Sequence, residues 1–471
     1  MVAVALAGWA WRLAGVTSQS LWRDEVDSLR FATRAWPEML AAFSRPGENG
    51  PLFYLLLRPW LTLAGHSEFA LRFPGVWMGV LALPLIFVWG KSLFGPKTGV
   101  WTGLLAAFLL ALAPYHIWYS QEARMYALVV ALVMLSMWFF REAVTRGGWP
   151  RWGAWYLFTS MGFYIHVLTA LALGVQLAWL GLTPGWRRRW RPAAIALGLL
   201  ILPYLPLIGW QWKLLTNSHF RTGLPFAPLG KMLGGLFTVQ VEGILPAAFW
   251  FWALAGLLLI AALLLPAPRR SLGDQSIALL TSWILLPPLL LFLISLITPL
   301  YLDRYLIWTL PALVLMMAVG AVNVARRSPP LALLLLTILI AFQLHQNWRQ
   351  MHLPIKPDMR AAAEYVAPRR GPQELTLFLM PYIHDAYQYY DPGPYAWAEA
   401  PYANRQPDAS QIPEHLTKLT SGYAGLWLVE SEAAFYDRNG LIHAWLDKNA
   451  DLVNEAHFVL VDVYHYHLLR K

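Results

Sequence analysis

Apolar segments recur along the chain from the N-terminus to about residue 345, separated by short polar loops. Each segment holds roughly 17 to 25 mainly apolar residues, the length at which an α-helix crosses a hydrocarbon core of about 30 Å. The pattern then stops, and residues 346–471 carry more charge, Asn, Gln and Tyr. The sequence therefore predicts a polytopic α-helical membrane domain over 1–345 and a soluble domain over 346–471, long enough to fold by itself.

Basic residues between the apolar segments predict their orientation, because short loops rich in Lys and Arg stay on the cytoplasmic side. The basic loops are 91–97, 141–151, 187–191, 269–270 and 326–327. If all of them are cytoplasmic, the chain has about eleven membrane-spanning helices. The predicted spans run near 1–17, 70–93, 98–119, 125–141, 152–166, 167–184, 191–209, 244–265, 275–297, 304–325 and 329–345.

The apolar segment 51–64 (PLFYLLLRPWLTLA) is the test of this count. A further span there would put every later basic loop outside the cell. The segment is short and contains Arg58 and Pro59, so we predict a helix that lies along the outer interface, where a snorkelling Arg58 and the aromatic Trp60 are favourable. A long first outer loop, about 18–69, follows from this interpretation.

Several polar side chains fall on the outer side in this topology, although none was used to derive it. They are Glu122, Arg124, His166, Asp303 and Arg304. Residues 152–182 are too many for one span and barely enough for two. We therefore predict two short helices that meet near His166, with the backbone groups at the break inside a wet cavity.

The composition agrees with a membrane protein, since 58% of the residues are hydrophobic and only 13% are charged. The formal net charge of +10 comes with basic loops, so it indicates membrane topology rather than nucleic-acid binding. With no cysteine, the chain has neither disulfides nor thiol catalysis. Neither a Walker-type GxxxxGK[ST] motif nor a GxGxxG run occurs, which argues against ATP or a dinucleotide as cofactor.

Helix and strand patterns alternate in the second domain. Residues 357–365 and 440–448 have helical patterns, whereas 375–380, 425–429 and 457–468 have strand patterns. These elements predict a small α/β domain on the extracytoplasmic side. The adjacent His384 and Asp385 look like a metal motif, but neighbouring residues rarely face one ion together, so we predict that both lie on the surface.

The acidic pair Asp24-Glu25 follows the first apolar segment directly. One interpretation is structural, because acidic residues stabilise the first turn of a helix through its dipole. Carboxylates at a membrane face are also costly and are usually kept for a function. A carboxylate there can accept the proton of an attacking hydroxyl or amine, or it can hold a divalent metal beside a phosphate leaving group. The residues alone leave these roles open.

The arginines on the outer side have two interpretations as well. Arg124, in the motif SQEARMY that we expect to start a helix at residue 120, can meet lipid phosphate or bind one phosphate specifically, because guanidinium is bidentate. Arg304 can anchor a span, pair with Asp303 or contact a lipid-linked phosphate. His166 can be a buried bundle histidine or a site residue at the helix break.

Several motifs in this order resemble the GT-C superfamily of membrane glycosyltransferases, in particular bacterial relatives of the protein mannosyltransferases that use dolichyl-phosphate mannose and of the lipid A aminoarabinose transferase. The motifs are Asp24-Glu25, NGPLFYLLLRPW (49–60), SEFALRFPGVWMGVLALPL (67–85), SQEARMYAL (120–128), His166 and RYLIWTLPAL (304–313). The resemblance covers nearly the whole chain. It implies a polyprenyl-phosphate-linked sugar as donor and transfer at the outer face.

The resemblance also implies roles for individual residues. Asp24 would be the catalytic base, and Glu25 would support it or help to bind a metal. Arg124 and Arg304 would contact the donor phosphate, and the supporting residues would be Glu122, His166 and Tyr305. A divalent metal, if the enzyme uses one, would take its ligands from Asp24, Glu25, Glu122 or His166.

One motif departs from the pattern of these relatives. They commonly have His-Pro-Pro-Leu or Lys-Pro-Pro-Leu where this chain has Asn49-Gly50-Pro51-Leu52. A basic or metal-binding side chain is therefore missing there, which argues against a metal ligand or a phosphate contact at this position.

The sequence thus predicts a multi-pass glycosyltransferase of the cell membrane, with its active site and second domain outside the cytoplasm. Its partners would be a polyprenyl-phosphate-linked sugar and an acceptor that is a lipid, glycan or protein. Two alternatives are a transporter or flippase of lipid-linked sugars and a polymerase or ligase of lipid-linked glycans. The chain shows no paired repeats with matching broken helices, as transporters often do.

Overall fold

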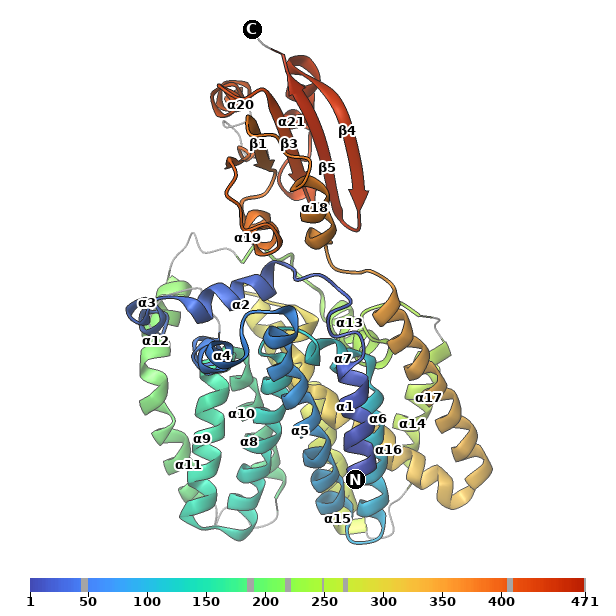
Figure 1. Cartoon of the computed structure of the whole chain (residues 1–471). Coiled ribbons are helices and arrows are strands. Elements are labelled where there is room, and N and C mark those ends of the chain that lie inside the picture. Colours follow the sequence, from blue (N-terminus) through green and yellow to red (C-terminus); the bar gives the residue numbers. More distant parts are fainter. Residues whose placement is uncertain are drawn as a thin grey trace. The chain divides into compact units, whose positions relative to one another are not determined.

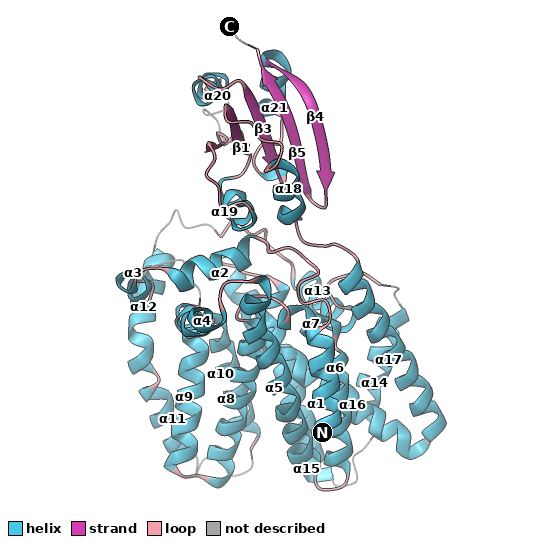
Figure 2. Ribbon diagram, viewed as in Figure 1, coloured by secondary structure: helices cyan, strands magenta, loops and turns pink. Residues whose placement is uncertain are grey.

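The computed structural model describes all residues except 44–49, 184–189, 217–221, 248–249, 266–269, 405–409 and 470–471. The chain divides into two compact units, each described by itself below. Residues 1–16 and 31–350 form the first, which we call the membrane unit. Residues 17–30 and 351–471 form the second, the tail unit. Helices dominate the membrane unit, and all five strands of the described sheet lie in the tail unit (Figures 1 and 2).

The membrane unit is a bundle of helices joined by short connections (Figure 1). In chain order the helices are α1 (Val2–Leu13), α3 (Trp36–Ala41), α4 (Pro51–Ala64), α5 (Glu68–Phe94), α6 (Thr98–Leu112), α7 (Pro114–Ser120), α8 (Tyr126–Arg146), α9 (Trp149–Ile165), η1 (Val167–Ala170), α10 (Leu171–Leu182), α11 (Trp190–Leu199), α12 (Ile201–Thr216), α13 (Leu229–Glu242), α14 (Trp250–Leu264), α15 (Arg270–Ser295), η3 (Asp303–Thr309), α16 (Leu310–Arg327) and α17 (Pro329–His352). A further helix, α2 (Arg23–Thr33), begins in the tail unit and ends in the membrane unit.

Length and hydropathy identify the helices that can cross a bilayer. Within the described residues, five qualify by themselves, and α6 with α7 would make a sixth if this pair, bent by 61°, is one span. Shorter apolar helices occupy 2–13, 167–182, 190–206 and 251–264. The chain is thus a multi-pass membrane protein. A helix lies at each predicted span, but the count of eleven crossings stays a prediction.

The bend between α6 and α7 leaves backbone carbonyls without helical partners, and polar side chains satisfy them. Pro114 begins α7 and has no N–H to continue the ladder of α6. The guanidinium of Arg12 donates to the carbonyls of Leu110 and Ala111, both at 3.1 Å. The amides of two α17 residues donate to Leu112 (from Asn347, 2.8 Å) and to Pro114 (from Gln350, 3.1 Å). Such partners are necessary because lipid offers no water to a broken helix.

Helix α4 covers the predicted interfacial segment 51–64. It begins at a proline and lies between Gly50 (φ 77°) and Gly65 (φ 80°), both in left-handed conformations that suit glycine. Figure 1 shows α4 nearly end-on, whereas α5, α8 and α9 run along the bundle. The helix therefore lies across the direction of its neighbours within the membrane unit, and it is not among the helices long enough to span.

A mixed five-stranded sheet forms the centre of the tail unit, with strand order β2-β1-β3-β5-β4. β1 (Glu374–Phe378) pairs in parallel with β2 (Trp397–Glu399) and β3 (Gly425–Glu430), and β5 (Val461–Leu468) pairs antiparallel with β3 and β4 (Ala450–Phe458). Its helices are α18 (Met359–Val366), α19 (Pro381–Tyr390), α20 (Ile412–Thr420), η5 (Ala433–Phe435) and α21 (Leu441–Asn449).

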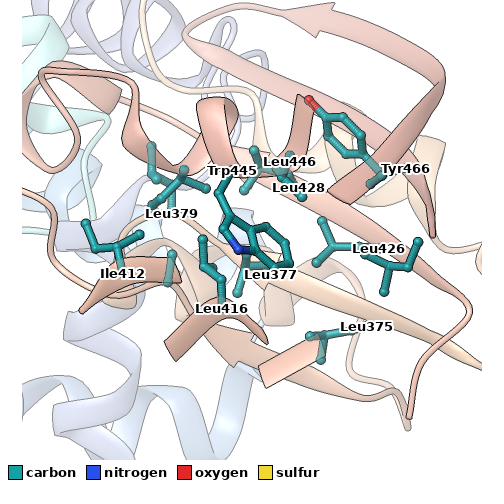
Figure 3. Close-up of a cluster of buried hydrophobic side chains, with 14 of the residues drawn as sticks. Leu375, Leu377, Leu379, Ile412, Leu416, Leu426, Leu428, Trp445, Leu446 and Tyr466 are labelled. Atoms are coloured by element: carbon teal, nitrogen blue, oxygen red, sulfur yellow. The ribbon is translucent and has the colours of Figure 1, made fainter. Parts of the chain in front are cut away.

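The core of the tail unit lies between β1, β3 and β5 and the helices α20 and α21. Leucines of the two central strands pack on Trp445 and Leu446 of α21 and on Leu416 of α20 (Figure 3). These strands read as continuous apolar runs because both faces of a parallel strand are buried. Each predicted strand and helix of this domain is present, with ends shifted by a few residues.

The prediction that His384 lies on the surface was wrong. His384 is only 5% exposed, and its ring stacks on Trp397 at 3.5 Å between centroids. Asp385, the next residue of α19, forms an ion pair with Arg30. Successive side chains of a helix point about 100° apart, so one of them turns inward toward β1 while the other turns outward.

Candidate active site

The loop that carries Glu122 and Arg124 lies between α7 and α8. We expected a helix from residue 120, but 121–125 form bends and α8 begins only at Tyr126. The side-chain amide of Gln121 donates to the backbone carbonyls of Arg12 (3.1 Å) and Ala14 (2.7 Å) at the end of α1. The loop therefore caps another helix instead of extending its own, which explains why this prediction was wrong.

Two glycines of α5 bring this loop close to the bundle. A Cβ atom at Gly75 would lie 2.8 Å from the carbonyl oxygen of Ser120 and 2.9 Å from that of Glu122. A Cβ atom at Gly79 would lie 2.2 Å from the Oγ of Ser120. Only glycine leaves room for such contacts. Glu122 is 2% exposed as a consequence of this packing.

His166 lies where α9 ends and η1 begins, as the short helices in this region predicted. Its imidazole is buried, and its centroid is 4.9 Å from the ring of Tyr305 and 6.4 Å from that of Tyr126. The guanidinium groups of Arg124 and Arg304 are both close enough to act on its charge. Within the described residues, neither ring nitrogen has a hydrogen-bond partner.

Arg304 stands at the start of η3. The carboxylate of Asp303 accepts a hydrogen bond from the backbone N–H of Arg304 at 2.8 Å, which fixes the first turn. The phenol of Tyr119 on α7 interacts electrostatically with Asp303, Glu122 and Arg304. Tyr119 thus links the α7–α8 loop to η3.

Tyrosines surround this charged group, and the sequence analysis missed them. The rings of Tyr115, Tyr119 and Tyr126 follow one another at 5.0 Å between centroids, and the hydroxyl of Tyr54 accepts a hydrogen bond from Arg124 at 3.3 Å. A signal was available, because Tyr115 and Tyr119 are four residues apart in a short helix just before the SQEAR motif.

The structure therefore brings together five of the predicted site residues, all in the membrane unit: Glu122, Arg124, His166, Arg304 and Tyr305. We call this group, with its tyrosines, the cationic cluster. It comes from the ends of α7 and α9 and the starts of α8 and η3. The basic residues Lys91, Arg146 and Arg327 lie near the opposite ends of α5, α8 and α16.

The acidic pair belongs to the tail unit. Asp24 and Glu25 are in the first turn of α2, as the structural interpretation of this pair expected. Asp24 is half-buried, and its backbone carbonyl accepts a hydrogen bond from Ser28 at 3.2 Å. Glu25 is fully buried and forms an ion pair with Lys356, with 2.8 Å between Oε2 and Nζ.

Two of the residues named for a divalent metal, His166 and Glu25, do not suit one. His166 lies within the electrostatic reach of two guanidinium groups, and positive charge nearby opposes a second cation. The carboxylate of Glu25 is bonded to an ammonium group. Asn49 of the departing motif lies outside the described residues.

Comparisons with known proteins agree with this architecture. The family model of dolichyl-phosphate-mannose-protein mannosyltransferases matches residues 45–210. No curated protein sequence matches the chain. Among solved structures, ArnT from Cupriavidus metallidurans bound to undecaprenyl phosphate is 15% identical, with a TM-score of 0.60 over 98% of this chain and 97% of ArnT.

Two other structures are similar over most of this chain. The arabinofuranosyltransferase AftD from Mycobacteria is 16% identical, with a TM-score of 0.55 over 98% of this chain and 41% of AftD. The oligosaccharyltransferase AglB from Archaeoglobus fulgidus, in complex with an inhibitory peptide and a dolichol-phosphate, is 11% identical, with a TM-score of 0.55 over 98% of this chain and 74% of AglB. These likenesses show the fold: the chain is folded like these GT-C membrane proteins over nearly its whole length.

Proposed function

We propose that this protein transfers a sugar from a polyprenyl-phosphate-linked donor to an acceptor at the extracytoplasmic face of the cell membrane. The observation that carries the proposal is the cationic cluster, in which Arg124 and Arg304 lie about one buried histidine. Two guanidinium groups in a protected site can bind a phosphate through bidentate hydrogen bonds. ArnT, the similar structure with undecaprenyl phosphate, supports a lipid phosphate as the ligand.

The proposed reaction forms one bond to the anomeric carbon, breaks another, and moves one proton. A hydroxyl or amine of the acceptor attacks the anomeric carbon of the sugar, and its proton moves to the carboxylate of Asp24. The bond between the anomeric carbon and the phosphate oxygen breaks, and the electron pair leaves with polyprenyl phosphate. Arg124 and Arg304 stabilise the growing negative charge on that phosphate. A single displacement inverts the configuration of the anomeric carbon.

The remaining residues of the cationic cluster have supporting roles in this proposal. Tyr305 packs on His166 and fixes its ring, and Tyr54 orients the guanidinium of Arg124. Glu122 lies on the same loop as Arg124, and its carboxylate, which like Arg304 interacts electrostatically with Tyr119, balances part of the positive charge. Their shared task is to preorganise the two guanidinium groups before the donor binds.

The distribution of charge supports the extracytoplasmic side of the membrane for this site. Lys91, Arg146, Arg326 and Arg327 lie near helix ends opposite to those that carry the cationic cluster. If the basic ends face the cytoplasm, the cluster opens to the outside. A donor whose phosphate is carried by lipid reaches such a site without a nucleotide.

The test of the proposed function is transfer by purified protein reconstituted in vesicles with an extract of its native membranes as acceptor source. Radiolabelled undecaprenyl-phosphate forms of mannose, aminoarabinose and arabinofuranose serve as donors. We expect one of them to yield a labelled product and released undecaprenyl phosphate. Asp24→Asn should reduce the turnover at least ~10³-fold, as expected for loss of a general base, whereas Asp27→Asn on the same helix should keep it.

Other outcomes would contradict the proposal. Movement of intact labelled donor across the vesicle membrane, without a new product, would identify a flippase. If label appears in the acceptor product only when the donor carries an oligosaccharide, the protein is a polymerase or ligase. Normal turnover by Asp24→Asn would remove Asp24 from the base role.

A further inference from the structure

The beginning of the predicted first outer loop, residues 17–30, is part of the tail unit. The side chain of Gln19 accepts hydrogen bonds from the backbone N–H groups of Ile355 (2.9 Å) and Lys356 (3.2 Å) and donates to the carbonyl of Leu353 (2.8 Å). The hydroxyl of Ser20 donates to the carbonyl of Pro357 at 2.6 Å. Residues 17–30 are thus attached to the segment that leads from α17 into α18.

The beginning of α2 is fixed by side chains of α19. The backbone N–H of Leu21 donates to the hydroxyl of Tyr390 at 2.6 Å. The guanidinium of Arg23 lies 3.8 Å from the ring centroid of Tyr382, and Arg30, one end of the same segment, is ion-paired with Asp385. Helix α2 is therefore held at several points along the segment that contains the acidic pair.

The pair of Glu25 and Lys356 is the buried centre of this attachment. Glu25 has no exposed surface, and Lys356 is 7% exposed. A buried ion pair contributes little net stability, because both charges lose their hydration, but it fixes geometry when each charge needs its partner. Lys356 is itself held in place, since its backbone N–H is bonded to Gln19 and it precedes the N-cap Asp358 of α18.

We propose that Lys356 is a positioning residue for glycosyl transfer, which acts through its ion pair with Glu25 to orient the first turn of α2 and the carboxylate of Asp24. The inference rests on the proposed role of Asp24 as the base. It assigns Glu25 a structural task rather than the catalytic or metal-binding task expected from the sequence. It also gives the tail unit a part in the chemical step, because Lys356 belongs to that unit.

The expected effect is on turnover rather than on donor affinity. Asp24 and Glu25 are neighbours in one helical turn, so a shift of Glu25 moves Asp24 with it. A misplacement of about 1 Å can reduce a rate on the order of 100-fold. The donor phosphate would be bound by residues of the membrane unit, so its KM should not depend on Lys356.

The experiment compares Lys356→Met with Lys448→Met in the full-length protein, using whichever of the three labelled donors the wild type turns over fastest. Lys448 is an exposed lysine at the end of α21 in the same unit. We expect Lys356→Met to lower kcat by about 10- to 100-fold while the donor KM changes by less than about 2-fold. Lys356→Arg and the exchange Glu25→Lys with Lys356→Glu should restore part of the lost turnover. If Lys356 acted only through the stability of the fold, kcat would be unchanged at a temperature where every variant is folded. There would then be no lost turnover for these variants to restore.

Hydrogen exchange provides a second readout that does not depend on activity. If the ion pair fixes this segment, the backbone amides of residues 19–30 should exchange faster in Lys356→Met than in the wild type. Their exchange rate in Lys448→Met should equal that of the wild type. Wild-type kcat or wild-type exchange in Lys356→Met would overturn the inference. Its failure is distinct from failure of the proposed function, because Asp24→Asn is measured beside it. An inactive Asp24→Asn with a normal Lys356→Met rejects the positioning role alone.

Discussion

Two arginines of the membrane unit lie in opposite kinds of surroundings. Arg12 is fully buried, and its guanidinium donates to the carbonyls of Gly8, Leu110 and Ala111 and to the Nδ1 of His116 (2.7 Å). Arg304 lies among ionisable side chains, beside Asp303 and within reach of His166 and Tyr119. The first arginine completes a broken helix, whereas the second is part of a cluster of charged side chains.

This difference shows how a charge kept inside a membrane protein can be interpreted. A guanidinium whose N–H groups donate to the carbonyls at a helix end takes the place of water, and its role is structural. Two guanidinium groups close together can bind an anion such as phosphate, which is the role proposed for Arg304 and Arg124. The two regions should therefore respond differently to mutation, the first through stability and the second through activity.

The largest effect is expected for Arg304→Ala. Loss of one preorganised cation at the phosphate should lower kcat/KM by about 10²- to 10³-fold, while the unfolding temperature in detergent stays close to that of the wild type. Steady-state transfer and thermal unfolding measure the two quantities. Arg151→Ala, at a helix start near the basic loops, is the control and should keep normal transfer. If Arg304→Ala lowers stability and leaves transfer unchanged, Arg304 has a structural role like that of Arg12.

Arg12→Met should act in the opposite way. Removal of the guanidinium leaves buried carbonyls at the end of α6 without donors, which should lower the free energy of unfolding by about 3 kcal/mol. Denaturant unfolding in detergent measures the loss, and transfer is then normalised to the folded fraction. We expect turnover per folded molecule within about 3-fold of wild type, since the effect is assigned to stability. Intact stability with lost turnover would place Arg12 in the active site.

Gly79→Ala tests the close contact between α5 and the loop of the cationic cluster. The new methyl group would meet the Oγ of Ser120 at 2.2 Å, so the backbone must shift, at a cost of about 2 kcal/mol. Gly153→Ala is the matched control, because nothing lies within 4 Å of a Cβ there. Equal stability of the two variants would show that the α7–α8 loop tolerates displacement.

The smallest effect is expected for Gln121→Ala. The variant loses the hydrogen bonds from the side-chain amide to Arg12 and Ala14 carbonyls, worth about 1 kcal/mol in unfolding free energy. Because Gln121 precedes Glu122 and Arg124, a small increase in donor KM should accompany the loss. Gln121→Glu offers no amide donor and should behave alike. A normal donor KM in both variants would show that the hydrogen bonds of Gln121 to the end of α1 do not affect the geometry of the cationic cluster.

The sequence predicted much of the local structure because its signals are local. Hydropathy identified the apolar helices, and Pro51 with Gly65 bounds the short helix α4. The break at His166 followed from the length of the segment around it. The helix start at residue 120 could not be predicted correctly, because Gln121 bonds to α1, more than a hundred residues away in sequence.

The sequence by itself determined that the chain is a membrane protein and which helix ends carry basic residues, and it predicted which side chains could meet a phosphate. Hydrophobic length and charge act on each segment separately, so no partner is required to detect them. Only the tertiary structure decided that Tyr119 and His166 join Arg304 in one cluster, that Arg12 completes α6, and that Glu25 pairs with Lys356. Such contacts join residues far apart in sequence, where periodicity carries no information about which side chains meet.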